Sequence, residues 1–163
     1  MELPSGILIM INITFVCHGN ICRSPMAEYI FKDLVKKAGL DGKFYITSHA
    51  TSTEELGNGI YYRAKEELDL HHIGGYENHI AKQFRPNDYD KFDYIIIMDT
   101  NNKYNLMYTI KADPKGKVHK LLDYTNNKGD IEDPWYTRNF DKVFNQIENG
   151  CKCLLDYLIK EVL

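Results

Sequence analysis

The sequence predicts an α/β protein in which helices cover both faces of a parallel sheet. Short apolar segments alternate along the chain with amphipathic segments of helical period. This alternation is typical of successive strand–helix–strand units. The first apolar segment, residues 7–16, is nearly continuous rather than alternating with polar residues. A continuous apolar run is expected of a strand that is buried on both faces of a parallel sheet.

The helix and strand limits follow from local signals. Ser24-Pro25 indicates a helix start, and Gly39 indicates its end. Further strands are expected at residues 44–47, 94–98 and 118–122. Further helices are expected at residues 61–70, 101–109 and 137–163. The last of these has an apolar side formed by Phe140, Val143, Phe144, Ile147, Cys151, Leu154, Leu155, Leu158 and Ile159.

Length, charge and cysteine content limit the class of protein. The 163 residues suit one domain over residues 1–163. The net charge of −3 does not favour nucleic acid or an anionic membrane as a partner. The first apolar run is too short to span a bilayer and has no basic segment before it, so we expect no signal or anchor there. Four cysteines in two close pairs suit a reducing compartment, and we expect the cytoplasm.

The loop after the first strand carries the strongest chemical signal. Five residues separate Cys17 from Arg23, and a helix start follows at once. Backbone N–H groups that curl into a helix N-terminus bind anions and favour a cysteine thiolate. An arginine fork binds two phosphate oxygens. We therefore expect Cys17 to act as a nucleophile on a phosphoryl group. The expected phosphate-binding residues are His18, Gly19, Asn20, Ile21, Cys22, Arg23 and Ser24.

A second candidate segment lies just before the last helix. Asp133 precedes Pro134, which stiffens the loop, and Trp135 and Tyr136 are suited to line a slot for an aromatic ring. A positioned carboxylic acid can protonate a leaving phenolate, and we expect Asp133 to do so. Glu132 is a rival acid.

The sequence resembles the low-molecular-weight protein tyrosine phosphatases over essentially its whole length. The resemblance is carried by the segment from Val16 to Pro25 and by Asp133-Pro134-x-Tyr136. Two further segments support it: Phe92-Asp93-Tyr94-Ile95 through Met98-Asp99, and His79-x-Ala81-Lys82-Gln83.

The resemblance implies a four-stranded parallel sheet in a Rossmann-like three-layer sandwich, the fold of phosphotyrosine protein phosphatase I. It implies hydrolysis of phosphotyrosine and aryl phosphates through a phosphocysteine, without metal or cofactor. It implies a hydrogen-bond network of Asn20, Ser24, Ser48 and His79, a reversible Cys17–Cys22 disulfide, and a role for Asp99 in the site wall. Glu54 stands where many members carry an aromatic residue, so we expect it in the substrate pocket with Trp135 and Tyr136.

The implied partners are phosphotyrosine proteins, with phosphate and related oxyanions as inhibitors. We expect mainly a monomer, with weak self-association through tyrosines such as Tyr61 and Tyr62. Three alternatives stay open. A thioredoxin-coupled arsenate reductase needs further cysteines in the middle of the chain, and residues 24–150 contain none. A protein-arginine phosphatase tends to carry Thr at the position of Ile21. A non-catalytic phosphotyrosine-binding module is expected to lose Cys17, Arg23 or Asp133.

Overall fold

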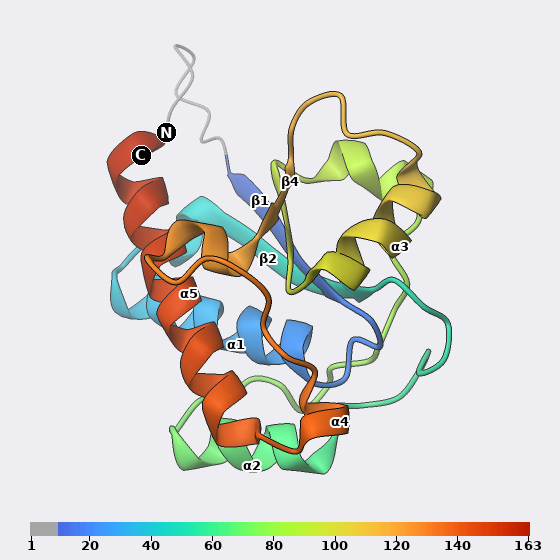
Figure 1. The fold of residues 1–163 in the computed structure, drawn as a ribbon. Helices are drawn as coiled ribbons and strands as arrows, with labels where there is room; N and C mark the ends of the chain where they lie inside the picture. The colour runs from blue at the N-terminus through green and yellow to red at the C-terminus, as the bar shows by residue number, and fades with distance from the viewer. Residues whose placement is uncertain (1–9) are drawn as a thin grey trace.

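The computed structural model describes residues 10–163, and its centre is a sheet of four parallel strands (Figure 1). The strands are β1 (Ile11–Cys17), β2 (Phe44–Ala50), β3 (Tyr94–Ile97) and β4 (Val118–Lys120). Their order across the sheet is β2-β1-β3-β4, so β2 is added on one side of β1 and β3 and β4 on the other, and the topology switches between β1 and β3. Ligands of open α/β sheets bind at such a switch point, beyond the carboxyl ends of the strands.

Helices connect the strands on both faces of the sheet, as expected. The α-helices are α1 (Arg23–Lys37), α2 (Tyr62–Leu70), α3 (Thr100–Ile110), α4 (Pro134–Thr137) and α5 (Phe140–Glu161). Short 3₁₀ turns lie at η1 (Asp41–Lys43), η2 (Pro86–Lys91) and η3 (Leu121–Tyr124). In Figure 1, α1 and α5 cover one face of the sheet and α3 covers the other.

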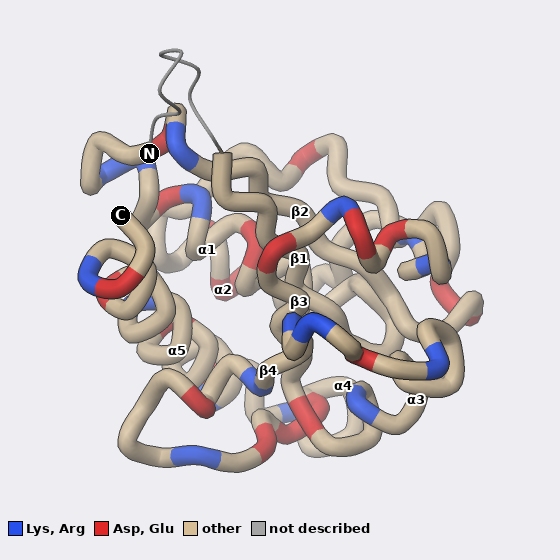
Figure 2. The backbone as a smooth tube through the Cα atoms, turned by 90° about the horizontal axis from the view of Figure 1, so that it is seen from above, with Lys and Arg blue, Asp and Glu red and all other residues tan. Residues whose placement is uncertain are grey.

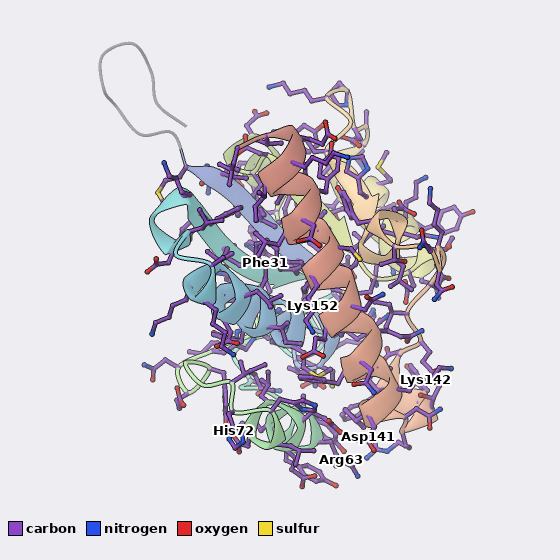
Figure 3. All side chains as sticks on the ribbon, turned by 90° about the vertical axis from the view of Figure 1, so that its left-hand side faces the viewer. Phe31, Arg63, His72, Asp141, Lys142 and Lys152 are labelled. Atoms are coloured by element: carbon purple, nitrogen blue, oxygen red, sulfur yellow. The ribbon has the colours of Figure 1, made fainter. Side chains whose placement is uncertain are left out.

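The core has one apolar layer on each face of the sheet. Ile13 and Phe15 of β1 pack with residues of α1 and α5, whereas Val16 packs with Leu106 of α3. Because side chains alternate along a strand, this continuous run supplies both layers at once. Phe31, labelled in Figure 3, fills the space between α1 and the sheet and contacts the ring of Phe15 at 5.7 Å between centroids.

The expected helix over residues 137–163 is wrong at its start. The chain instead forms α4, then places Arg138 in a left-handed conformation with a φ of 64°, and begins α5 at Phe140. A left-handed residue ends a helix because the next peptide groups leave the helical path. Ile159 was expected on the apolar side but is 43% exposed. Successive helix residues are turned by about 100°, so Leu158 faces the core and Ile159 lies at its flank.

Smaller differences concern other boundaries. The strand expected at residues 7–16 begins at Ile11, and residues 7–9 lie outside the described part of the chain. The first helix begins at Arg23, so Pro25 is its third residue; an N–H is not needed there, because the first N–H groups of a helix have no acceptor within it. The second strand continues to Ala50. The last strand ends at Lys120 because the chain turns into η3.

Close packing of α5 depends on a glycine within the helix. A Cβ atom built on Gly150 would lie 2.5 Å from Cγ of Leu121, which is fully buried in η3. Only a residue without a side chain permits this approach. Gly150 thus allows α5 to pack directly against the segment that follows β4.

Charged residues of both signs are interspersed along the chain, as Figure 2 shows. This distribution agrees with the small net charge of −3. Within residues 10–163, no helix has the length and apolar character needed to cross a membrane.

One buried imidazole makes the fold sensitive to acid. His49 of β2 is 6% exposed, lies edge-on to Phe84 and Phe92, and has Nδ1 2.6 Å from Oγ1 of Thr14. Burial lowers the pKa of His49 from its ordinary value of 6.5 to about 4, and the positive charge of Lys82 acts in the same direction. The folded protein therefore holds His49 neutral where an unfolded chain binds a proton.

We predict that His49 makes the protein less stable as the pH falls from about 6.5 to about 4. In this window the unfolded chain binds more protons, so the free energy of unfolding rises with pH. This destabilisation is absent above about pH 6.5 and reaches about 3 kcal/mol below about pH 4. Urea unfolding of wild type and His49→Gln across this range should give a shallower pH dependence for the variant.

The matched control is His72→Asn. His72 is exposed and its φ of 59° suits asparagine, so this variant should keep the wild-type pH dependence. Equal slopes for wild type and His49→Gln would show that His49 does not carry the effect.

Candidate active site

The loop of residues 17–23 lies at the carboxyl end of the central strand. Cys17 is the last residue of β1, and Arg23 is the first residue of α1. These two residues are 3% and 2% exposed, so the loop is built into the core. The N-terminus of α1 points its free N–H groups and the positive end of its dipole into the loop. The backbone of this segment is therefore suited to bind an anion.

Asn20 gives the loop its curvature. Its φ of 60° is in the left-handed region, which is unfavourable for a residue other than glycine. Its Nδ2 donates to Oγ of Ser24 (2.7 Å) and to Oγ of Ser48 (2.9 Å). Its Oδ1 accepts from the backbone N–H of Lys82 (3.2 Å). All hydrogen-bonding atoms of this fully buried amide are thus used to hold the conformation.

The network extends beyond the four residues expected from the sequence. His79 Nε2 donates to the backbone oxygen of Asn20 (2.9 Å), so His79 contacts the main chain of Asn20 rather than its side-chain amide. Ser48 Oγ donates to Oε1 of Glu28 (2.6 Å), a buried carboxylate of α1 that the sequence analysis missed. Glu28 follows Ser24 by four residues on the same face of α1, which places it near the network, but its hydrogen bond to Ser48 of β2 is decided by the tertiary structure.

The Cys17 sulfur lies at the floor of the site. Its Sγ is 3.0 Å from Oγ of Ser24 and 3.4 Å from the backbone N of Ser24. The Cys17 thiol donates to this Ser24 oxygen, and the Ser24 hydroxyl is directed at the backbone oxygen of His49 (3.4 Å); once Cys17 is ionised, the Ser24 hydroxyl can donate to the sulfur instead. Two donors directed at the sulfur stabilise a thiolate.

Arg23 joins three separate segments of the chain. Its Nη1 donates to Oδ2 of Asp99 (2.6 Å) and to the backbone oxygen of Ile131 (2.8 Å). Its Nη2 lies 3.5 Å from Oδ2 of Asp133. Burial by itself would lower the pKa of Arg23, but the negative charges of Cys17, Asp99 and Asp133 raise it above its ordinary value. The guanidinium is thus fixed and charged, with Nη1 held by Asp99 and Ile131 and Nη2 beside Asp133.

The two neighbouring acids, Glu132 and Asp133, have different surroundings. Asp133 caps α4: its Oδ1 accepts from the backbone N–H of Trp135 (3.0 Å), and its carboxylate borders the pocket. Glu132 pairs with Lys142, labelled in Figure 3, at 2.6 Å. Hydrogen bonds from Lys142, Thr137 and Asn139 lower the pKa of Glu132 to about 2. Glu132 therefore stays ionised at any moderate pH and is a poor proton donor.

A pocket of about 220 Å³ opens over the Cys17 sulfur. Its lining contains the three residues expected to act in catalysis, together with the expected pocket residues. The lining residues are Cys17, His18, Gly19, Ile21, Cys22, Arg23, Glu54, Glu55, Asp133, Trp135 and Tyr136. Among them, Glu55 was not expected from the sequence.

The two walls of the pocket differ in chemistry. One wall is aromatic: Trp135 is 42% exposed and packs against the ring of Tyr61 at 4.8 Å, and Tyr136 is 78% exposed. Two carboxylates, Glu54 and Glu55, also line the pocket. His18, which we expected among the phosphate-binding residues, turns its Nε2 to Oε2 of Glu54 at 2.9 Å. The His18 side chain thus lies at the mouth of the pocket.

The cysteines fall into two classes of environment. Cys22 is 5% exposed and lines the same pocket as Cys17. Burial raises the pKa of the Cys22 thiol, and the negative charges of Cys17 and Asp133 raise it further, so Cys22 is held as a thiol. Both other cysteines lie on α5: Cys151 faces the core and is fully buried, and Cys153 is partly exposed. Within residues 10–163, no three His, Cys, Asp or Glu side chains are grouped as a metal site would require.

Comparison with known proteins agrees with this geometry. The family model described as low molecular weight phosphotyrosine protein phosphatase matches residues 12–163. The low molecular weight protein-tyrosine-phosphatase YfkJ of Bacillus subtilis is 40% identical over 154 residues, which cover 93% of this chain and 98% of YfkJ. The crystal structure of YfkJ matches with a TM-score of 0.91 over 94% of this chain and 98% of that chain.

Two other solved structures show the range of relatives. A low molecular weight protein tyrosine phosphatase from Streptococcus pyogenes is 34% identical, with a TM-score of 0.82 over 94% of this chain and 95% of that chain. A drosophila arginine phosphatase is 30% identical, with a TM-score of 0.81 over 91% of this chain and 98% of that chain. On the family model, which spans the fold and the whole site, this chain belongs to the low molecular weight phosphotyrosine protein phosphatase family.

Proposed function

We propose that this protein hydrolyses phosphotyrosine in proteins, and small aryl phosphates, through a phosphocysteine formed on Cys17. One observation carries the proposal: the Cys17 sulfur, the Arg23 guanidinium and the Asp133 carboxylate border one pocket at the N-terminus of α1. These three groups supply a nucleophile, a positive charge and a proton. The reaction they support needs no metal or cofactor.

Phosphate binding is assigned to the loop of residues 17–23 and to Arg23. The curvature at Asn20 turns the backbone N–H groups of the loop inward, and α1 adds the positive end of its dipole. Nη1 of Arg23 is held by Asp99 and Ile131, so Nε and Nη2 are the atoms we assign to two phosphate oxygens. The developing charge on the transferred phosphoryl group is stabilised by donors that are already in place.

The chemical steps follow from this arrangement. The Cys17 thiolate attacks phosphorus, the bond to the tyrosyl oxygen breaks, and Asp133 donates its proton to the departing phenolate. Asp133, now ionised, removes a proton from water, and the resulting oxygen nucleophile attacks the phosphocysteine. The sulfur–phosphorus bond breaks, which restores the thiolate and releases inorganic phosphate. Ser24 stabilises the thiolate before the first step and after the second.

Tyrosine is favoured as the substrate residue by the pocket walls. Trp135 and Tyr136 offer an aromatic surface beside the phosphate site. Ile21 gives an apolar contact where a guanidinium group would need a polar one, so phosphoarginine is the less favoured substrate. An arsenate reductase is not favoured because Cys151 is sealed in the core. A protein that only binds phosphotyrosine would not need Cys17 and Asp133 beside Arg23 in one pocket, so a purely binding role is not favoured.

We further propose that the protein acts in the cytoplasm, mainly as a monomer, on phosphotyrosine proteins. The four cysteines are unpaired, which suits a reducing compartment. Inorganic phosphate and similar oxyanions should inhibit because they fit the same loop. Tyr62 is 58% exposed and could contribute to weak self-association. The net charge of −3 does not favour nucleic acid or an anionic membrane as a partner.

Replacing the nucleophile tests the mechanism. We predict that Cys17→Ser lowers turnover of 4-nitrophenyl phosphate by at least about a thousandfold, because a serine hydroxyl is not ionised in this site. The assay is run at mildly acidic pH with a chelator present. Phosphate binding by the variant, measured by calorimetry, should persist because Arg23 and the loop N–H groups remain. Turnover close to wild type would remove Cys17 from its proposed role.

Replacing the acid tests the assignment of the proton donor. We predict that Asp133→Asn lowers kcat/KM for phenyl phosphate by about a hundred- to a thousandfold, and for 4-nitrophenyl phosphate by much less, because kcat/KM reports the step in which the leaving group departs and 4-nitrophenolate leaves without protonation. Glu132→Gln is the matched control and should stay within about threefold of wild type, because Glu132 is held ionised away from the pocket. Equal losses for the two esters would argue against Asp133 as the acid.

We also propose that Cys22 protects Cys17 from irreversible oxidation. Peroxide oxidises the Cys17 thiolate to a sulfenic acid and is itself reduced to water. The Cys22 thiol, which lines the same pocket, then attacks the Cys17 sulfur, and a disulfide and water are formed. A thiol reductant restores both residues.

Peptide mapping after mild peroxide tests this protection. We predict a Cys17–Cys22 disulfide in wild type and recovery of most activity after reduction. In Cys22→Ser, Cys17 should advance to the sulfinic and sulfonic acids and activity should not recover. Cys153→Ser, on the outer part of α5, should behave as wild type. Full recovery of Cys22→Ser would contradict the protective role.

A further inference from the structure

We propose that Glu54 and Glu55 select substrates by charge, so that phosphotyrosine next to Lys or Arg is preferred over phosphotyrosine next to Asp or Glu. The inference rests on the proposed phosphatase function. It concerns the mouth of the pocket, where the residues beside the phosphotyrosine must lie once the phosphate occupies the loop.

The segment that carries the two carboxylates is fixed at both ends. The backbone N–H of Thr51 donates to the oxygen of Cys17 (2.9 Å), and that of Ser52 donates to the oxygen of His18 (3.0 Å). At the other end, the N–H of Gly57 donates to the oxygen of Ala81 (3.0 Å). The first two bonds attach this segment directly to the phosphate-binding loop, and the third attaches its other end to Ala81. The carboxylates are therefore held near the phosphate site and do not have to be ordered when a substrate binds.

The charges of both carboxylates remain available to a substrate. Glu54 is exposed and its only partner among the described residues is His18, which is itself partly exposed. Glu55 accepts from Nδ2 of Asn58 (2.6 Å), a neutral group that orients the carboxylate without cancelling its charge. A Cβ built on Gly19 would lie 3.4 Å from Cγ of Glu55, so the Glu55 stem lies over the phosphate-binding loop.

Of the three cations Arg23, Lys142 and Arg138, the first two are paired with carboxylates. Arg23 is buried and pairs with Asp99. Lys142 pairs with Glu132 (2.6 Å). Arg138 keeps its charge, because its partner is the neutral hydroxyl of Tyr61 (2.7 Å), but it does not line the pocket. The rings of Trp135 and Tyr136, which also line the pocket, are uncharged. A residue beside the phosphotyrosine therefore meets net negative charge at the mouth.

The size of the effect follows from exposed charge pairs. An exposed pair changes an affinity by about two- to fivefold, and two carboxylates facing a charge on each side of the phosphotyrosine add to about tenfold. Because the mouth is open to solvent, salt screens the interaction over about 10 Å at 0.1 M and more strongly above that concentration.

The experiment compares two phosphotyrosine peptides of equal length, one with Lys and one with Glu on each side of the phosphotyrosine. The readout is the ratio of their kcat/KM values, for wild type and for the double variant Glu54→Gln/Glu55→Gln. The matched control is Asp156→Asn/Glu161→Gln, which removes the same charge from exposed positions of α5, toward the end of that helix farthest from α4 in Figure 1. Each ratio is measured at about 0.05 M and about 0.5 M salt.

We expect wild type and the control to prefer the Lys peptide about tenfold at low salt, and the Glu54/Glu55 variant to prefer it less than about twofold. High salt should bring the ratio of wild type toward that of the variant. Equal rates for the two peptides, or a preference that survives in the variant, would overturn the inference while the phosphatase function stands. Failure to hydrolyse either peptide or 4-nitrophenyl phosphate would overturn the proposed function and this inference with it.

Discussion

The left-handed backbone of Asn20, held by hydrogen bonds from three parts of the chain, is the constraint on which the site depends. This conformation, with a φ of 60°, turns the backbone within the loop between β1 and α1. Ser24, Ser48 and Lys82 bind the Asn20 side chain, and His79 binds its carbonyl oxygen. A buried polar network of this kind is stable only when its members are satisfied, which explains why Glu28 is needed to accept from Ser48.

Arg23 connects this loop to the other half of the sheet. Its contacts with Asp99, Ile131 and Asp133 gather segments that follow β3 and β4 around the helix N-terminus where β1 ends. Three negative groups around one buried guanidinium keep it charged and oriented. The same contact places the proposed acid opposite the proposed nucleophile. Chemistry and fold stability therefore share one residue, because an unpaired buried arginine would cost several kcal/mol.

The proposed nucleophile and the phosphate-binding arginine are buried at the floor of the pocket, whereas the residues proposed for substrate recognition lie at its mouth. The floor of the pocket is made of buried groups with fixed hydrogen bonds, and it suits any phosphate ester that reaches it. The mouth is made of exposed groups: an aromatic wall at Trp135 and Tyr136, and an acidic wall at Glu54 and Glu55. Residues at the mouth can change without disturbing the core, so substrate preference can differ between relatives that share the floor of the site.

The sequence by itself determined the α/β class and the approximate place of the strands and of most helices, and it singled out Cys17, Arg23 and Asp133 as candidates. These follow from apolar periodicity and from a motif whose residues are adjacent in the chain. Only the tertiary structure decided that Arg138 separates α4 from α5, that Glu28 completes the Asn20 network, that Asp99 holds Arg23, and that Glu55 joins Glu54 at the pocket mouth. Each of these depends on contacts between segments far apart in the chain, and local sequence pattern carries no information on which distant side chain a buried polar group will meet.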